Sequence, residues 1–437
     1  MFKAGFSRVD ITPPLGEHLA GYFRVRLADG ILDPLYLNAL AMNDGEKTVI
    51  IIATDCLSIM EVFATKIREL ISSETGVPAD NIMITALHQH TSFRLGVWPW
   101  TGSMENESYL EILWRKYVDV AKMAIDDMKE ATISTAIQET SEPLAFIRRF
   151  KMKDGSTVTN PRNLDPNIDH PIGDADNNVR LVRFTRKDAK DIAFVNFSTH
   201  PDVIGGLKWS ADWPGFVRTY VEKDLGDVHC LVLNGAQGDS NHVSRYIAEE
   251  HGGYEWSKHM GRVISDTVVD IWNKTTEHKD TQLFSEIKMV YNKTNTDGIE
   301  RVEECQQMDA DYWAGKLDGP NKPNATTMGE VRRIKNIRQE TICQKIPVTV
   351  MAVGDIAFVG YGGEPFTEYA TNSRAFAPEM FVITCGLANG QQGYLPTKNA
   401  FDEGGYEARS SRFTPTLPEE LQGAAKEMLD KCNIYKM

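Results

Sequence analysis

The chain has 437 residues, enough to bury a large core in one α/β domain or in two or three smaller ones. Apolar residues make up 42%, charged residues 25% and aromatic residues 9%, a composition that excludes a disordered or fibrous protein. There are 61 acidic and 47 basic residues, and the resulting net charge of −14 disfavours binding to nucleic acid or to an anionic lipid surface.

The N-terminal residues 1–12 have the pattern of a strand and lack the apolar core of a signal peptide. No apolar run reaches the roughly 18 to 20 residues that a membrane-spanning helix needs. We therefore expect a cytoplasmic protein without a transmembrane segment. The six cysteines form no C-x-x-C pair, so we expect mostly buried thiols.

Further along the chain, apolar segments rich in β-branched residues alternate with segments that have the spacing of amphipathic helices. The predicted core strands are 48–54, 81–86, 179–184, 192–197, 228–233, 346–353, 356–359 and 381–385. The predicted helices are 62–73, 109–129, 214–225, 257–272 and 417–431. This alternation predicts an α/β protein in which layered mixed β-sheets are flanked by helices.

Residues 300–340 are polar and helix-like, with a turn-rich interruption at 318–325. This pattern predicts an inserted helical hairpin rather than a separate domain. The chain contains no internal repeat and no long linker rich in proline, glycine or serine. The simplest interpretation is one continuous domain over residues 1–437.

Several predicted strands run directly into short polar or glycine-rich segments that carry metal-ligand or turn-forming residues. Loops at the carboxyl ends of strands converge in α/β sheets, so we expect a functional site where these segments meet. The segments are residues 87–90, 198–200, 234–239, 362–364 and 389–394.

His88 and His90 are two residues apart, so both imidazoles project from the same face if the preceding strand continues that far. Such a pair suits a metal ion or an oxyanion. A pair of hydrogen-bonded core histidines is the other interpretation.

His200 follows an apolar strand and precedes Pro201, and Glu364 follows the flexible Gly362 and Gly363. Two histidines from different strands and one carboxylate would form a three-ligand zinc set with an open position. Such a site supports hydrolysis of an amide or ester, because bound zinc polarises a carbonyl and activates water. A structural histidine and a carboxylate at a helix N-terminus remain the alternatives.

The opening residues 5–21, GFSRVDITPPLGEHLAG, resemble the G-x-x-x-x-D-I-T-P-P-x-G-x-x-x-x-G start of neutral, non-lysosomal ceramidases. Later segments follow the same family in the same order: ITALHQHTS, NFSTHPD, WSADWPG, GAQGD, GYGGEPF, GYLPT and YEA. The likeness to the N-terminal catalytic domain of these enzymes covers nearly the whole chain. The resemblance implies a short form that lacks their C-terminal immunoglobulin-like domain.

By this resemblance the metal is Zn²⁺, and its ligands are His88, His200, Glu364 and Tyr394. The spacing of residues alone would not have pointed to the tyrosine, which would otherwise be interpreted as an ordinary loop residue.

The same resemblance places His90 and Arg148 near the substrate carbonyl, where they could stabilise a developing oxyanion. Ser240 is the weakest catalytic candidate, because it is shifted by one position from the serine of the family's G-D-x-S-P-N segment. Asp212 and Asp239 are expected to hold ligands and backbone in place.

The implied function is a zinc-dependent hydrolase, an amidase that cleaves an N-acyl amide by zinc-activated water. The substrate would be a ceramide-like lipid or a smaller soluble amide. A zinc esterase or sugar-directed hydrolase would use the same metal. A non-catalytic, metal-containing binding protein of the same fold is the alternative from another class. Residues 91–100 replace a glycine-rich turn of the family, and there Trp98 and Trp100 could line an acyl pocket or pack on the scaffold.

Overall fold

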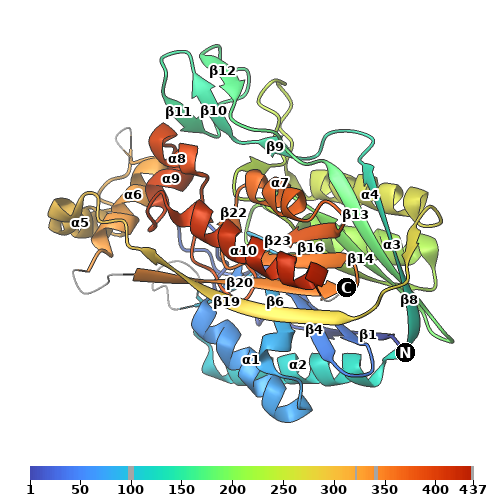
Figure 1. Cartoon of the computed structure of the whole chain (residues 1–437). Helices are drawn as coiled ribbons and strands as arrows, with labels where there is room; N and C mark the ends of the chain where they lie inside the picture. The colour runs from blue at the N-terminus through green and yellow to red at the C-terminus, as the bar shows by residue number, and fades with distance from the viewer. Residues whose placement is uncertain (97–102, 320–321, 339–342, 435–437) are drawn as a thin grey trace.

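The computed structural model describes residues 1–96, 103–319, 322–338 and 343–434 (Figure 1). Two mixed β-sheets pack against each other, and helices cover their outer faces. The predicted α/β architecture of layered mixed sheets flanked by helices is therefore confirmed. Within the described ranges, no helix is long and apolar enough to cross a membrane.

The larger sheet has the strand order β16-β14-β13-β8-β1-β3-β4-β6, with β18 also paired to β8. Its two outermost pairs, β14–β16 and β4–β6, are parallel, and the other pairs are antiparallel. The strands are β1 (Lys3–Asp10), β3 (Tyr36–Asn43), β4 (Thr48–Thr54), β6 (Ile82–Ala86), β8 (Lys129–Glu139), β13 (Asn178–Arg186), β14 (Asp191–Phe197), β16 (Val228–Asn234) and β18 (Thr276–His278).

The smaller sheet has the order β19-β20-β21-β23, and its β21–β23 pair is parallel. Its strands are β19 (Leu283–Lys293), β20 (Cys343–Val353), β21 (Ile356–Tyr361) and β23 (Phe381–Cys385). A continuous apolar layer fills the space between the sheets, where the rings of Phe194 and Phe358 pack edge to face at 4.9 Å. Burial of this layer holds the two sheets together.

Three pairs of helices complete the outer layers by burying apolar stripes against the sheets. The first pair packs on β3, β4 and β6, the second on β13, β14 and β16, and the third on the smaller sheet. The pairs are α1 (Glu61–Thr75) with α2 (Glu107–Asp126), α3 (Asp212–Leu225) with α4 (Gly253–Ile271), and α7 (Thr367–Phe376) with α10 (Leu417–Ile434).

The segment predicted as a helical insertion contains η2 (Ile299–Arg301), α5 (Val302–Trp313) and α6 (Ala325–Lys335). These helices lie at the left edge of the molecule in Figure 1. They form a small apolar cluster of their own, and Phe23 from the N-terminal part of the chain packs into it.

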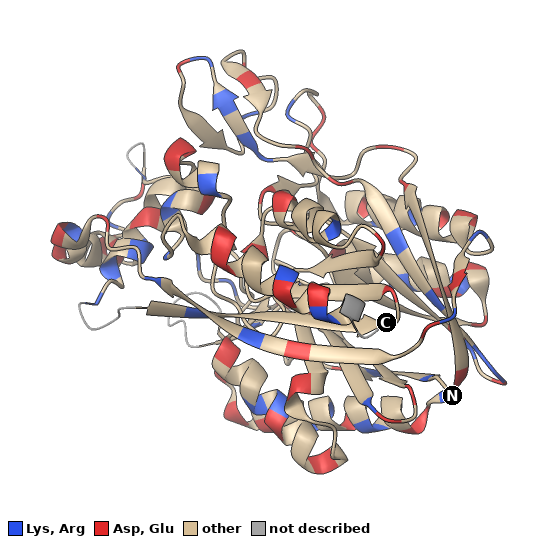
Figure 2. Ribbon diagram, in the orientation of Figure 1, with Lys and Arg blue, Asp and Glu red and all other residues tan. Residues whose placement is uncertain are grey.

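Short elements connect the layers and carry several candidate site residues. They are β2 (Gly30–Ile31), β5 (Ser58–Ile59), η1 (Ala79–Asn81), β7 (Arg94–Leu95), β9 (Phe146–Ile147), β10 (Arg149–Met152), β11 (Thr157–Thr159), β12 (Ile168–Pro171), β15 (Lys208–Trp209), β17 (Ser240–Asn241), β22 (Glu364–Pro365), β24 (Tyr394–Leu395), α8 (Lys398–Glu403) and α9 (Tyr406–Ser410). Figure 2 shows acidic and basic residues interspersed over the outer helices and loops, whereas the strands between the layers are mostly uncharged.

Candidate metal centre

Three of the four residues expected to bind a metal lie just after the carboxyl ends of strands from the two sheets. His88 follows β6 and His200 follows β14 in the larger sheet, while Glu364 follows β21 in the smaller one. Glu364 begins β22, which pairs in parallel with β24 and sets Glu364 opposite Tyr394. The fold therefore brings together side chains that are up to several hundred residues apart in the sequence.

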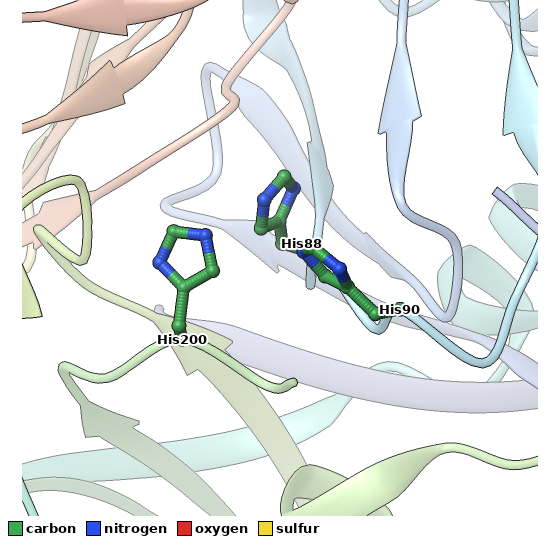
Figure 3. Close-up of side chains that lie close together, drawn as sticks. All are labelled: His88, His90 and His200. Atoms are coloured by element: carbon green, nitrogen blue, oxygen red, sulfur yellow. The ribbon is translucent and has the colours of Figure 1, made fainter. Parts of the chain in front are cut away.

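The local geometry at His88 differs from the expected continuation of a strand. β6 ends at Ala86, and His88 has a φ of 76°, in the left-handed region that non-glycine residues rarely adopt. The turn still brings His88 and His90 together, with ring centroids 5.1 Å apart (Figure 3). Convergence of the two rings thus comes from a turn and not from the alternation of a strand.

Backbone carbonyls orient two of the histidines. The Nδ1 atom of His88 lies 2.8 Å from the carbonyl oxygen of Leu57, and Nδ1 of His200 lies 2.8 Å from that of Gln237. A carbonyl can only accept, so each Nδ1 carries the proton and each Nε2 keeps its lone pair. This is the arrangement in which an imidazole is ready to bind a metal through Nε2.

Glu364 completes a donor set whose spacing suits a tetrahedral ion. Its Oε2 atom lies 3.3 Å from Nε2 of His88 and 3.5 Å from Nε2 of His200. Among the described residues Oε2 has no hydrogen-bond partner, although Glu364 is only 4% exposed. Two ligand atoms that are each about 2.0 to 2.1 Å from a tetrahedral zinc ion are about 3.4 Å apart. These three side chains therefore fit a zinc ion.

His90 offers a second way to complete the set. One ring nitrogen from each of His88, His90 and His200 lies within 4.8 Å of the other two, and all three residues are buried (Figure 3). This wider group can also hold a metal ion. The distances of 3.3 and 3.5 Å from Oε2 of Glu364 to the Nε2 atoms of His88 and His200 are nearer to the ligand spacing of a tetrahedral zinc site than the 4.8 Å limit of the three histidines is.

The protonation states favour metal binding. Burial, together with the nearby Arg148, holds the pKa of His200 well below its usual range, so the imidazole is neutral. Burial alone would raise the pKa of Glu364, but His88 and Arg148 lower it below its ordinary value, so the carboxylate is ionised. Burial and the Glu364 charge raise the pKa of the Tyr394 phenol, and a bound cation would favour its ionised form.

Arg148 lies beside this donor set in a fixed orientation. Its Nε donates to Glu407 at 2.7 Å, its Nη2 donates to the carbonyl of Gly238 at 2.8 Å, and its guanidinium carbon lies 5.2 Å from the centre of the Tyr394 ring. The Nη1 atom lies 3.4 Å from both ring nitrogens of His200. The structure therefore places a buried cation next to the candidate ligands.

Ser240 lies in β17 and is paired opposite Ile147, the residue that precedes Arg148 in the chain. Its hydroxyl is buried and has no hydrogen-bond partner among the described residues. The preceding Asp239 accepts hydrogen bonds from the amide and hydroxyl of Thr367, both at 2.8 Å, at the start of α7. Asp239 thus anchors a helix to this loop.

Asp212 has a comparable anchoring role on the other side of His200. Its carboxylate accepts hydrogen bonds from the amides of Val203 and Ile204 at 3.0 and 3.1 Å and from the hydroxyl of Ser257 at 2.7 Å. It fixes the segment that follows His200. Trp98 and Trp100, considered above as pocket residues, lie outside the described residues.

Other side chains at the site were not assigned from the sequence. Glu407 is fully buried and accepts hydrogen bonds from Arg148 and from the hydroxyl of Thr159, and Gln391 donates to Oε1 of Glu364 at 3.1 Å. Asp202 faces His90. Two of these residues could have been assigned from the sequence, because Glu407 lies in the YEA segment and Asp202 follows His200-Pro201.

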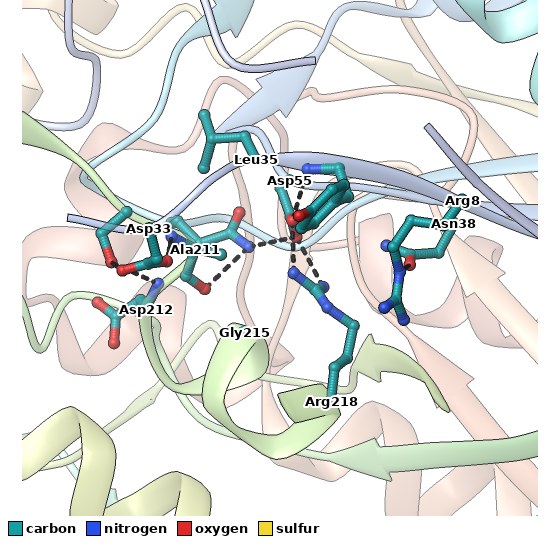
Figure 4. A network of polar contacts seen from close by, with 12 residues as sticks. Arg8, Asp33, Leu35, Asn38, Asp55, Ala211, Asp212, Gly215 and Arg218 are labelled. Carbon is teal, nitrogen blue, oxygen red and sulfur yellow. Dashed lines mark hydrogen bonds and ion pairs between the residues drawn. The ribbon is translucent and has the colours of Figure 1, made fainter. Parts of the chain in front are cut away.

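A buried ion pair contacts residues 88–90 through the side chain of Gln89. Gln89 donates to Oδ1 of Asp55 at 2.9 Å, and Arg218 binds both oxygens of the same carboxylate at 2.9 and 2.5 Å (Figure 4). We call Asp55, Gln89 and Arg218 the Asp55 cluster. Because Gln89 stands between the two histidines, this cluster fixes the turn that presents them.

The fold and the donor set together define an α/β protein with a candidate metal centre at the strand ends. No family model and no curated protein sequence matches this chain. Among solved structures, neutral ceramidase from Pseudomonas aeruginosa superposes with a TM-score of 0.74 at 15% identity, covering 98% of this chain and 74% of that one. A structure of a ceramidase complexed with C2 gives a TM-score of 0.71 at 13% identity, covering 99% and 75%. The fold of this chain is that of neutral ceramidase, as its sequence motifs predicted.

Proposed function

We propose that this protein is a zinc-dependent amide hydrolase of the ceramidase type, with His88, His200, Glu364 and Tyr394 as the metal ligands. The observation that carries the proposal is Oε2 of Glu364, which has no hydrogen-bond partner among the described residues and lies 3.3 and 3.5 Å from the Nε2 atoms of His88 and His200. When bound, zinc supplies polarisation of the substrate carbonyl and activation of water. The shared fold with neutral ceramidase supports an amide as the substrate.

Arg148 would stabilise the negative charge that develops on the amide oxygen. Burial alone lowers its pKa, but Tyr394 and Glu407 raise the pKa above its usual range, so the guanidinium stays cationic. Its bonds to Glu407 and to the Gly238 carbonyl hold it in place before substrate binds, and such preorganisation is what makes a buried donor effective.

His90 would move the proton between water and the leaving nitrogen. Burial lowers its pKa, so the ring is neutral and can accept a proton, and its Nε2 atom has no hydrogen-bond partner among the described residues. Ser240 remains the weakest candidate; its unpartnered hydroxyl could bind a polar group of the substrate.

The substrate that we propose is an N-acyl amide, either lipid-like as in ceramide or smaller and soluble. The names of the two structural neighbours support the lipid-like choice. A zinc esterase or a sugar-directed hydrolase would use the same ligands and differ in pocket shape. A non-catalytic binding protein would keep the metal but show no turnover.

The test compares metal content and hydrolysis in the wild type, His88→Ala and Glu364→Ala, with the exposed His170→Ala as the matched control. The substrates are a long-chain ceramide, a short N-acyl amide and the matching esters. We expect near-stoichiometric zinc and amide hydrolysis in the wild type and control. Both should be lost in the two ligand variants, with activity falling by more than about 1,000-fold.

A wild type that takes up no zinc after reconstitution contradicts the ligand assignment. Zinc without hydrolysis of any substrate would instead favour the binding protein, and turnover of esters alone would favour the esterase. His90→Ala separates the two ligand sets, because it should retain zinc if Glu364 and Tyr394 complete the site and lose zinc if the three histidines do.

A further inference from the structure

His90 differs from the other two histidines in what faces its Nδ1 atom. His88 and His200 each turn Nδ1 to a backbone carbonyl. The Nδ1 atom of His90 instead faces Oδ1 of Asp202 at 3.4 Å. In the described part of the chain, Asp202 supplies the one carboxylate within 4.0 Å of a His90 ring nitrogen.

Asp202 is itself held in place. The hydroxyl of Tyr22 donates to the same Oδ1 atom, and the Tyr22 ring packs edge-on to His90 with centroids 5.2 Å apart. The backbone amide of His90 donates to the carbonyl of Pro201 at 3.0 Å, which ties the two segments together next to Asp202. Tyr22, Asp202 and His90 thus form one contiguous group.

The hairpin that carries Tyr22 also confines the His90 ring. Gly21 has a φ of 107°, and a Cβ atom added there would lie 2.6 Å from Nδ1 of His90, so the glycine backbone packs directly on the ring. Arg26 donates to the carbonyl of His90 at 2.7 Å and stacks on the Tyr22 ring with its guanidinium carbon 4.1 Å from the centroid. Little freedom is left for His90 to turn away from Asp202.

We propose that Asp202, oriented by Tyr22, is the positioning residue of His90: it accepts the Nδ1 proton, so that the lone pair of Nε2 is presented to the reacting amide. A carboxylate that fixes the tautomer and orientation of an imidazole in this way is a general device of hydrolytic sites. The role assigned to His90 in hydrolysis rests on the proposed function. The contact between Asp202 and His90 is observed whatever the function is.

The proton balance of the step follows from this arrangement. As the oxygen of water bonds to the amide carbon, Nε2 of His90 takes one proton from the water, and the Nδ1 proton stays between His90 and Asp202. Nε2 then gives its proton to the amide nitrogen as the C–N bond breaks, so the products are a carboxylic acid and an amine. The Asp202 carboxylate faces the imidazolium that exists between the two transfers.

The activity test uses Asp202→Ala and Asp202→Asn, with Asp169→Ala as the matched control. Asp169 also contacts a histidine, His170, at 3.1 Å, but both residues are exposed. Loss of a residue that orients a site histidine typically costs 10–100-fold, so we expect kcat of Asp202→Ala to fall by about that factor with KM little changed. The asparagine variant should recover part of the loss, because its amide oxygen can accept the same proton. The control should be unchanged.

Zinc content must be measured on the same samples. We expect it to be unaffected in Asp202→Ala. Loss of zinc together with activity would overturn the proposal, because Asp202 would then support the metal ligands and not His90. Unchanged kcat would overturn it as well.

A second readout does not depend on activity. Nitrogen NMR of the imidazole rings, with His90→Gln for assignment, reports which nitrogen carries the proton. We expect the Nδ1–H tautomer at His90 in the wild type and its loss in Asp202→Ala. A proton on Nε2 in the wild type would overturn the proposal. If no amide is hydrolysed, the proposed function fails, and this spectrum still decides the contact between Asp202 and His90.

Discussion

Two buried polar groups lie on either side of residues 88–90 and differ in how their charges are compensated. In the Asp55 cluster, each carboxylate oxygen of the fully buried Asp55 accepts two hydrogen bonds, one of them from Arg218. At the candidate metal centre, Oε2 of Glu364 and Nε2 of His90 have no hydrogen-bond partner among the described residues, although these two residues are only 4% and 8% exposed.

This difference in compensation is the one expected between a structural group and a binding site. A buried charge is tolerated when it is paired and hydrogen-bonded, and an unpaired buried polar atom costs free energy. In the Asp55 cluster, hydrogen bonds within the protein compensate the buried charges. At the candidate metal centre, the atoms without a partner are ones that a cation or a substrate could bind, which favours binding over stability.

The largest effect that this comparison predicts is on stability, at the Asp55 cluster. Asp55→Ala leaves the Arg218 guanidinium buried without its partner, so we expect the free energy of unfolding to fall by about 3 to 5 kcal/mol. Urea denaturation of metal-free protein measures it, with the exposed Asp174→Ala as control. A loss below about 1 kcal/mol, as for a surface pair, would show that this pair does not hold the turn.

At the metal centre the opposite behaviour is expected of Glu364→Gln. In metal-free protein this variant removes a buried charge without stranding a permanent cation, so the free energy of unfolding should stay the same or rise. Zinc at 100 times its dissociation constant should stabilise the wild type by about 2.7 kcal/mol and the variant much less. Thermal and chemical denaturation with and without zinc measure both effects. Severe destabilisation of the metal-free variant would make Glu364 a structural residue and remove the contrast.

The smallest predicted effect concerns His242, whose Nδ1 is buried without a partner and whose pKa is influenced by Asp202. Burial lowers its pKa from 6.5 to about 4. Because the folded value is the lower one, the unfolded chain takes up the proton first. The stability contribution is therefore present above pH 6.5 and is lost as the pH falls toward 4.

The measurement compares unfolding at pH 7.5 and pH 5 in metal-free wild type and His242→Gln. At pH 5 the linkage amounts to about 2 kcal/mol, so the wild type should lose about that much more stability than the variant on acidification. Equal losses would mean that the His242 ring titrates alike in the folded and unfolded chain.

The sequence by itself determined most of the strands and the identity of the candidate ligands. Strands buried on both faces, such as β4 and β21, are continuous apolar runs and were predicted from composition alone. β8 and β19 were missed because they are partly exposed and mix polar with apolar residues, and β3 because it lacks β-branched residues. His88, His200 and Glu364 were indicated by polar segments that follow strand ends, whereas Tyr394 was indicated only by the resemblance to neutral ceramidases.

Only the tertiary structure decided what surrounds those ligands. Arg148 meets Glu407 across 259 residues, and Asp55 meets Arg218 across 163, so no local pattern connects the partners. The turn at His88 could likewise not be predicted from the sequence, since the presence of a histidine does not specify a positive φ. Short-range regularities reflect the period of helices and strands, whereas pairing of buried charges depends on how whole layers pack. For this reason the sequence indicated the candidate site residues, and only the packed structure showed that Asp202, Glu407 and the Asp55 cluster lie against them.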